Sequence, residues 1–180
     1  PNPNLSHFRG IDIWNSASDA DKFMENGWIT QLFRESKPST GFAADGINLG
    51  HNSVGPLEGE KTKVVTLDKN PEKFLRQAGR IKPGDSQTGN NALTHILKQR
   101  RDLKSAADNM IAKQIRTVNL GHGFSESKIG AQFETAARLL VAGVKVPVLK
   151  LTIKKFDTHA GQEPLHTELL TEIATSISTF

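Results

Sequence analysis

The hydrophobic positions of this 180-residue chain alternate between helical spacing and short apolar runs. Apolar residues three or four apart predict helices around residues 6–14, 28–33, 88–117 and 125–141, and from 163 to the chain end. A further helix is predicted to begin at Pro71, with proline at its first position. Short β-branched or alternating runs predict strands near 42–49, 64–67 and 146–153. Helices that separate strands are typical of a layered α/β fold with a mainly parallel sheet flanked by helices. We therefore expect one α/β domain over residues 1–180.

Three strands are few for a domain of this length, so we expect the chain to be an incomplete part of a larger domain.

Ser6 is a good N-cap for the first helix, in which Phe8, Ile11 and Trp14 share one face. The second tryptophan, Trp28, begins the next helical stretch. Both tryptophans are predicted to anchor the core.

Composition narrows the class of protein. Hydrophobic residues at 36% and charged residues at 23% fit a soluble globular domain, and no apolar run reaches the ~20 residues of a membrane span. The net charge is +4, but the basic residues are scattered among 19 acidic ones and cluster only at residues 98–101. We therefore expect a solvated surface and no nucleic-acid partner. The absence of cysteine excludes disulfides, thiolate metal sites and cysteine nucleophiles.

The candidate chemistry lies after the last predicted strand, where Asp157 and His159 stand two residues apart. Ligands of open α/β sheets bind outside the carboxyl ends of the strands, and in extended backbone these two side chains point the same way. A carboxylate and an imidazole suit zinc or manganese. The alternative is that Asp157 caps the following helix or begins a turn, while His159 is an exposed loop residue. Further candidates are His51 in a Gly-rich loop, His122 between two glycines, and Gln162.

Four motifs in fixed order resemble one family. They are NPNLSHF at residues 2–8, DIW at 12–14, GW at 27–28 and FDTHAGQ at 156–162. Together they resemble the uncharacterised bacterial family named domain of unknown function 1501, which is grouped with the alkaline phosphatase-like superfamily of phosphatases and sulfatases. The resemblance covers nearly the whole chain and implies an alkaline phosphatase-like fold.

The resemblance also implies roles for individual residues. Ser6 stands where these enzymes carry a nucleophile at a helix start, with His7 beside it, and a helix N-terminus favours an oxyanion. Asp157 and His159 resemble the metal-holding Asp-x-x-x-His pair, although the spacing here is the shorter Asp-x-His. The family pattern places an early acidic ligand and a late Asp-His-Gly outside residues 1–180, in the remainder of a longer chain.

The function implied by the resemblance is a metal-dependent hydrolase of phosphate or sulfate esters that uses zinc, manganese or calcium. The isolated chain, as an incomplete part of the centre, is expected to bind metal poorly and to be inactive. The alternative is a non-catalytic secreted binding or scaffold module that keeps the fold. Periplasmic or secreted location is also implied only by the resemblance, since no signal sequence is recognised within residues 1–180.

Overall fold

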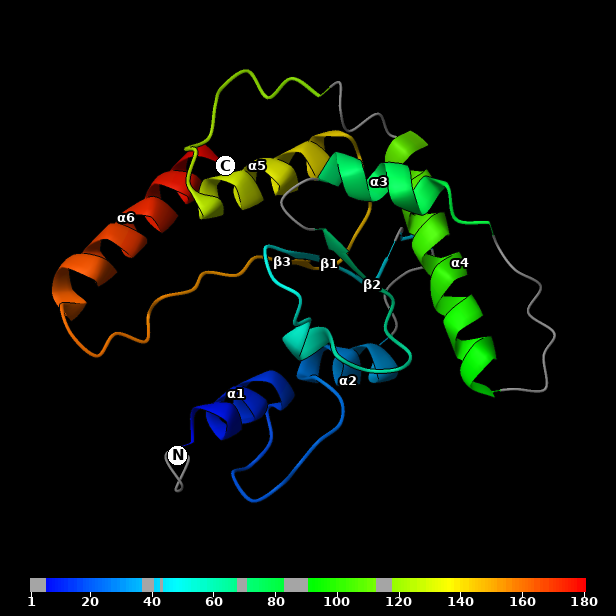
Figure 1. Ribbon diagram of the computed structural model, residues 1–180, viewed down its shortest axis with the longest axis horizontal. Helices are drawn as coiled ribbons and strands as arrows, with labels where there is room; N and C mark the ends of the chain where they lie inside the picture. Colours follow the sequence, from blue (N-terminus) through cyan, green and yellow to red (C-terminus); the bar gives the residue numbers. More distant parts are fainter. Residues whose placement is uncertain (1–5, 37–40, 43, 68–70, 83–90, 113–117) are drawn as a thin grey trace.

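The computed structural model describes residues 6–36, 41–42, 44–67, 71–82, 91–112 and 118–180. Among the described residues two α-helices precede the first strand, three lie between the second and third strands, and one follows the third, in the order that the hydrophobic spacing predicts (Figure 1). In chain order the elements are α1 (His7–Ser16), α2 (Trp28–Glu35), β1 (Gly46–Leu49), the 3-10 turn η1 (Gly55–Leu57), β2 (Val64–Leu67), α3 (Pro71–Gly79), α4 (Asn91–Ala112), α5 (Lys128–Val141), β3 (Leu149–Lys150) and α6 (Gln162–Thr179).

The described strands form one parallel sheet in the order β2-β1-β3, which confirms the α/β class and the parallel sheet. In the register of this sheet, Ile47 of β1 lies between Val65 and Leu149. Strand β2 has the predicted bounds, whereas β1 and β3 are shorter than predicted, and β3 ends at Lys150 instead of 153. One reason is that the side chain of Gln132 takes the place of a neighbouring strand: its Nε2 donates to Thr152 O at 3.0 Å and its Oε1 accepts from Thr152 N at 2.8 Å.

Helices cover both faces of the sheet. Figure 1 shows α3 and α5 on one side and α1, α2 and η1 on the other, with α4 beside α3 and α6 beside α5. The buried cluster joins the three strands to α3, α4 and α5 through aliphatic side chains: Ala44, Ile47, Leu49, Val65, Leu67, Leu75, Ala78, Ala106, Ala107, Ala136, Leu139 and Val144. Within the described residues no helix is both long and apolar enough to cross a bilayer.

Two helix ends follow from local sequence. The Ser6 hydroxyl oxygen accepts a hydrogen bond from the Arg9 amide at 3.3 Å, so the predicted N-cap of α1 is confirmed. Ser127, two residues later than the predicted start at 125, caps α5 by accepting from Gly130 N at 3.0 Å. The longest predicted helix, 88–117, is described only as α4, and both ends of its predicted range lie outside the described residues.

The prediction that the tryptophans anchor the core is wrong. Trp14 is 79% exposed and Trp28 is 43% exposed. Helix α1 instead buries Arg9 and Ser16. The Arg9 guanidinium lies 4.1 Å from the centre of the Phe23 ring and donates to the main-chain carbonyls of residues 19, 20 and 22. The helix is therefore fixed by hydrogen bonds on its polar side, and its aromatic side faces outward.

Candidate functional site

The predicted site lies on the connection that leads from β3 to α6, residues 151–161 (Figure 1), where most residues from 154 onward are exposed. Asp157 does not cap the following helix, because the N-cap of α6 is Gly161, in a left-handed conformation with φ of 61°. Lys155 also has a positive φ, 81°, which is unusual for a residue with a side chain. This bend redirects the chain directly before Asp157.

Three titratable side chains meet on this connection. His7 Nδ1 lies 3.8 Å from Asp157 Oδ2, and His159 Nε2 lies 3.8 Å from Asp157 Oδ1. His7 is the first residue of α1, so this carboxylate–imidazole cluster (His7, Asp157, His159) brings the start of α1 next to the connection between β3 and α6. At 3.8 Å the atoms are too far apart for hydrogen bonds, and each pair is an ion pair only when its imidazole is protonated.

The carboxylate–imidazole cluster is open to solvent. The side chains of His7, Asp157 and His159 are 72%, 66% and 87% exposed. Imidazole nitrogen and carboxylate oxygen are ligands that zinc and manganese accept. Among the described residues, however, no group of three or more His, Cys, Asp or Glu side chains is arranged to hold a metal ion. The donors fit a metal chemically, but they are not a complete site by themselves.

His166 holds the backbone of this connection, a role that no sequence pattern above predicts. Its Nε2 lies 2.9 Å from the carbonyl oxygen of Phe156 and 3.4 Å from Thr158 Oγ1. Its ring also lies against the Phe156 ring, with 5.1 Å between centroids. The available signal was its position in the first turns of the predicted final helix, from which a side chain can reach back to the preceding loop.

The remaining predicted residues have other surroundings. Ser6 caps α1 directly before His7, and Gln162 is exposed at the first position of α6. His51 Nδ1 accepts from the amide of Ser53 at 3.0 Å. His122 is exposed, with its ring 5.6 Å from that of Phe124.

A polar row crosses the sheet near the carboxyl ends of its strands, at register positions Thr66, Asn48 and Lys150. Asn48 is fully buried, with its amide nitrogen 3.3 Å from Thr66 Oγ1 and its amide oxygen 3.2 Å from Lys150 Nζ. The Lys150 ammonium also donates to Ser53 O and Thr152 Oγ1, each at 3.1 Å. Burial lowers the pKa of Lys150, because the charged form loses hydration.

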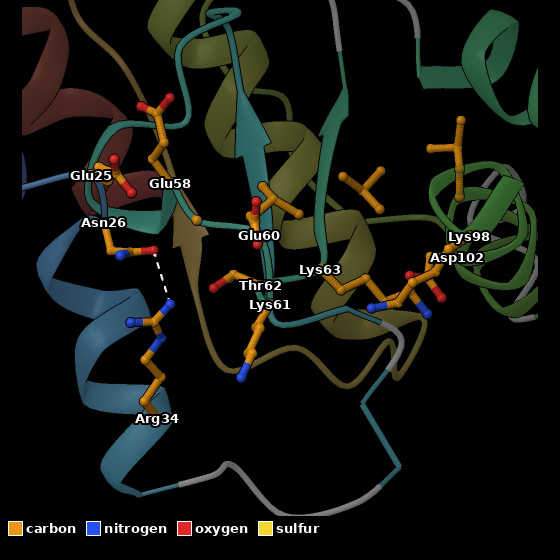
Figure 2. Close-up of a pocket in the computed structure, with 14 residues that line it drawn as sticks. Glu25, Asn26, Arg34, Glu58, Glu60, Lys61, Thr62, Lys63, Lys98 and Asp102 are labelled. Atoms are coloured by element: carbon orange, nitrogen blue, oxygen red, sulfur yellow. Dashed lines mark hydrogen bonds between the residues drawn. The ribbon is translucent and has the colours of Figure 1, made fainter. Parts of the chain in front are cut away.

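A concave surface lies at the opposite, amino edge of the sheet (Figure 2). This hollow of about 710 Å³ is lined by side chains of both charges. Figure 2 shows Glu25 and Glu58 at one end and Lys63, Lys98 and Asp102 at the other. Because the charges in this hollow are mixed, its lining does not favour one class of ligand.

Comparisons with known proteins add no narrower class. No family model matches this chain, and neither the curated proteins nor the solved structures contain a match. The part of the chain that the structure describes has an α/β fold with a three-stranded parallel sheet and an open carboxylate–imidazole cluster.

Proposed function

We propose that this chain is part of a metal-dependent hydrolase of phosphate or sulfate esters with an alkaline phosphatase-like fold. The observation that carries the proposal is the carboxylate–imidazole cluster, in which His7 and His159 each face a different oxygen of Asp157. Residues predicted from two separate motifs thus lie together, although 150 positions separate them along the chain.

In this proposal Asp157 and His159 are metal ligands, and the remaining ligands lie beyond the described residues. Divalent metal would polarise the ester and stabilise negative charge on the attacking and leaving oxygens. The Ser6 hydroxyl is the proposed nucleophile. As the N-cap of α1 it lies at the positive end of the helix dipole, which favours an oxyanion and an anionic substrate. His7 is placed beside it to take a proton, with its Nδ1 turned toward Asp157.

Metal content and turnover test the proposal. The natural protein, purified without chelator, is compared with the double variant Asp157→Ala/His159→Ala by elemental analysis and by hydrolysis of aryl phosphate and aryl sulfate. The control carries Asp21→Ala and His122→Ala, an exposed Asp and His of the same types outside the cluster. We expect loss of metal and of turnover in the first variant alone. Unchanged metal content there would overturn the ligand assignment.

The openness of the carboxylate–imidazole cluster favours a second candidate, a secreted binding module without catalysis, since catalytic centres commonly exclude water. Ser6→Ala separates the two. Loss of the cap costs about 1 kcal/mol of stability in either case. In the hydrolase the same substitution abolishes turnover, whereas in the binding module ligand affinity stays unchanged.

A further inference from the structure

The polar row Thr66–Asn48–Lys150 contrasts with the rest of the sheet. Strands of a parallel sheet covered on both faces are normally apolar throughout. Here a fully buried amide lies between a hydroxyl and an ammonium group, in register across all three strands. Buried polar groups contribute little to stability even when every hydrogen bond is made. Their place near the carboxyl ends of the strands, where ligands of α/β sheets bind, indicates a role in binding.

The hydrogen bonds of the row determine which way the Asn48 side-chain amide points. Asn48 Nδ2 donates to the carbonyl of His51 at 2.5 Å and to Thr66 Oγ1, so both amide protons are used. The amide oxygen of Asn48 must then face Lys150, whose ammonium can only donate. The row therefore holds the positive charge of Lys150 in one position at the edge of β3.

That positive charge has no negative partner. Among the described residues Lys150 forms no ion pair, and its three protons go to neutral oxygens of Asn48, Ser53 and Thr152. Lys150 is half-buried, so the charge is partly removed from water without a compensating carboxylate. Such a site gains most from an added anion, since the attraction between opposite charges is stronger where water is partly excluded.

We propose that Lys150 binds a tetrahedral oxyanion, phosphate or sulfate, at the carboxyl edge of the sheet. The oxyanion takes the place of the Ser53 carbonyl, which belongs to the exposed part of the loop after β1, while the bonds to Asn48 and Thr152 remain. A hydrogen bond to a neutral carbonyl oxygen is thereby exchanged for one to a charged oxygen, and this ion pair is strengthened because water is partly excluded. That this oxyanion is the phosphate or sulfate group of an ester substrate rests on the proposed function. The existence of an oxyanion site at Lys150 does not depend on it.

Titration of the metal-free chain tests this site. Inorganic phosphate, sulfate and, as a planar anion, acetate are added at constant ionic strength in the presence of chelator, with binding followed by calorimetry. We expect saturable binding of phosphate or sulfate, about tenfold weaker in Lys150→Met and largely kept in Lys150→Arg. Lys145→Met, at an exposed lysine just before β3, is the matched control and keeps wild-type affinity.

The outcomes separate the two proposals. Asp157→Ala should bind the oxyanion as the wild type does, and if this variant loses metal without losing the oxyanion, both proposals stand. Equal phosphate affinity in folded Lys150→Met and wild type overturns the oxyanion site and leaves the hydrolase proposal untouched. If Lys150→Met does not fold, nitrogen-15 NMR of the lysine ammonium groups in the wild type decides: a phosphate-dependent shift of the Lys150 signal supports the site, and an unmoved signal refutes it.

Discussion

Gly27 lies where α2 begins against the turn η1, and it leaves no space for a side chain. It is the N-cap of α2, and its amide donates to the carbonyl of Glu58 at 2.9 Å. A Cβ atom at this position would lie 2.1 Å from the carbonyl oxygen of Pro56 and 2.7 Å from that of Gly55. Both are backbone atoms, so no rotation of a side chain relieves the overlap. Gly27→Ala must therefore force α2 and η1 apart.

The expected cost of Gly27→Ala follows from these contacts. Adding a methyl group to a closely packed contact costs about 1–3 kcal/mol. Weakening the hydrogen bond from Gly27 to Glu58 adds about 1 kcal/mol. We expect the free energy of unfolding to fall by about 3 kcal/mol, which for a domain of this size lowers Tm by about 6–12 °C. Because α1 packs on the same turn, the carboxylate–imidazole cluster should also be disturbed at His7.

Urea and thermal unfolding, followed by circular dichroism, measure this effect. Gly123→Ala is the matched control, since a Cβ there meets no atom within 4 Å. In a position with room, replacing glycine by alanine is neutral or stabilises by about 0.5 kcal/mol through the unfolded state. If Gly27→Ala unfolds within about 0.5 kcal/mol of the wild type, the close packing of α2 on η1 is refuted.

Three further substitutions test other parts of the fold. Gln132→Ala removes both hydrogen bonds to the backbone of Thr152 and should cost about 2 kcal/mol in urea unfolding. Arg9→Lys keeps the charge but loses the planar guanidinium that donates to three carbonyls, and should lower the free energy of unfolding by on the order of 1–2 kcal/mol. The control Arg34→Lys, on the exposed side of α2, should change it by less than about 0.5 kcal/mol. Burial lowers the pKa of Lys150 from its ordinary value of 10.5, so at high pH the unfolded chain binds more protons than the folded chain. The free energy of unfolding of the wild type relative to Lys150→Met should therefore be constant below the folded pKa. It should rise as the pH increases from that pKa toward 10.5.

The parts of the fold that depend on local sequence could be predicted. The strand at 64–67 and the start of α3 at Pro71 agree with their patterns because turn residues and the fixed φ of proline act over a few positions. Strand length at β3 could not be predicted, since Gln132 from another element replaces the strand pairing at Thr152. The exposure of Trp14 also required knowledge of α1 packing, because helical spacing shows that a face is apolar but not whether it is covered.

The candidate site divides in the same way. The two-residue spacing of Asp157 and His159 suggested side chains that face one point, and their facing atoms lie 3.8 Å apart. The approach of His7 depends on how α1 packs, so only the family resemblance suggested it. The sequence predicts Lys150 only as one position of the strand at 146–153, and its importance appears only when its register neighbour Asn48 is known to be buried.

What positions Asp157 is the backbone and not the charges around it. Exposed ion pairs contribute little, so the two imidazoles cannot fix the carboxylate. The hydrogen bond from His166 to the Phe156 carbonyl, 2.9 Å long, and the positive φ of Lys155 determine the path of the chain instead. The carboxylate is thus held in place while both of its oxygens stay open to a ligand.

His166→Ala should release this bend. We expect about tenfold faster hydrogen exchange at the Thr158 amide, which donates to the Phe156 carbonyl at 3.1 Å. His166→Gln, whose amide can donate to the same carbonyl, should restore part of the protection, and His122→Ala, which removes an exposed ring elsewhere, should leave it unchanged. Unaltered exchange in His166→Ala would show that the backbone bend persists without His166, and the position of Asp157 would then depend on the conformation of residues 154–156 alone.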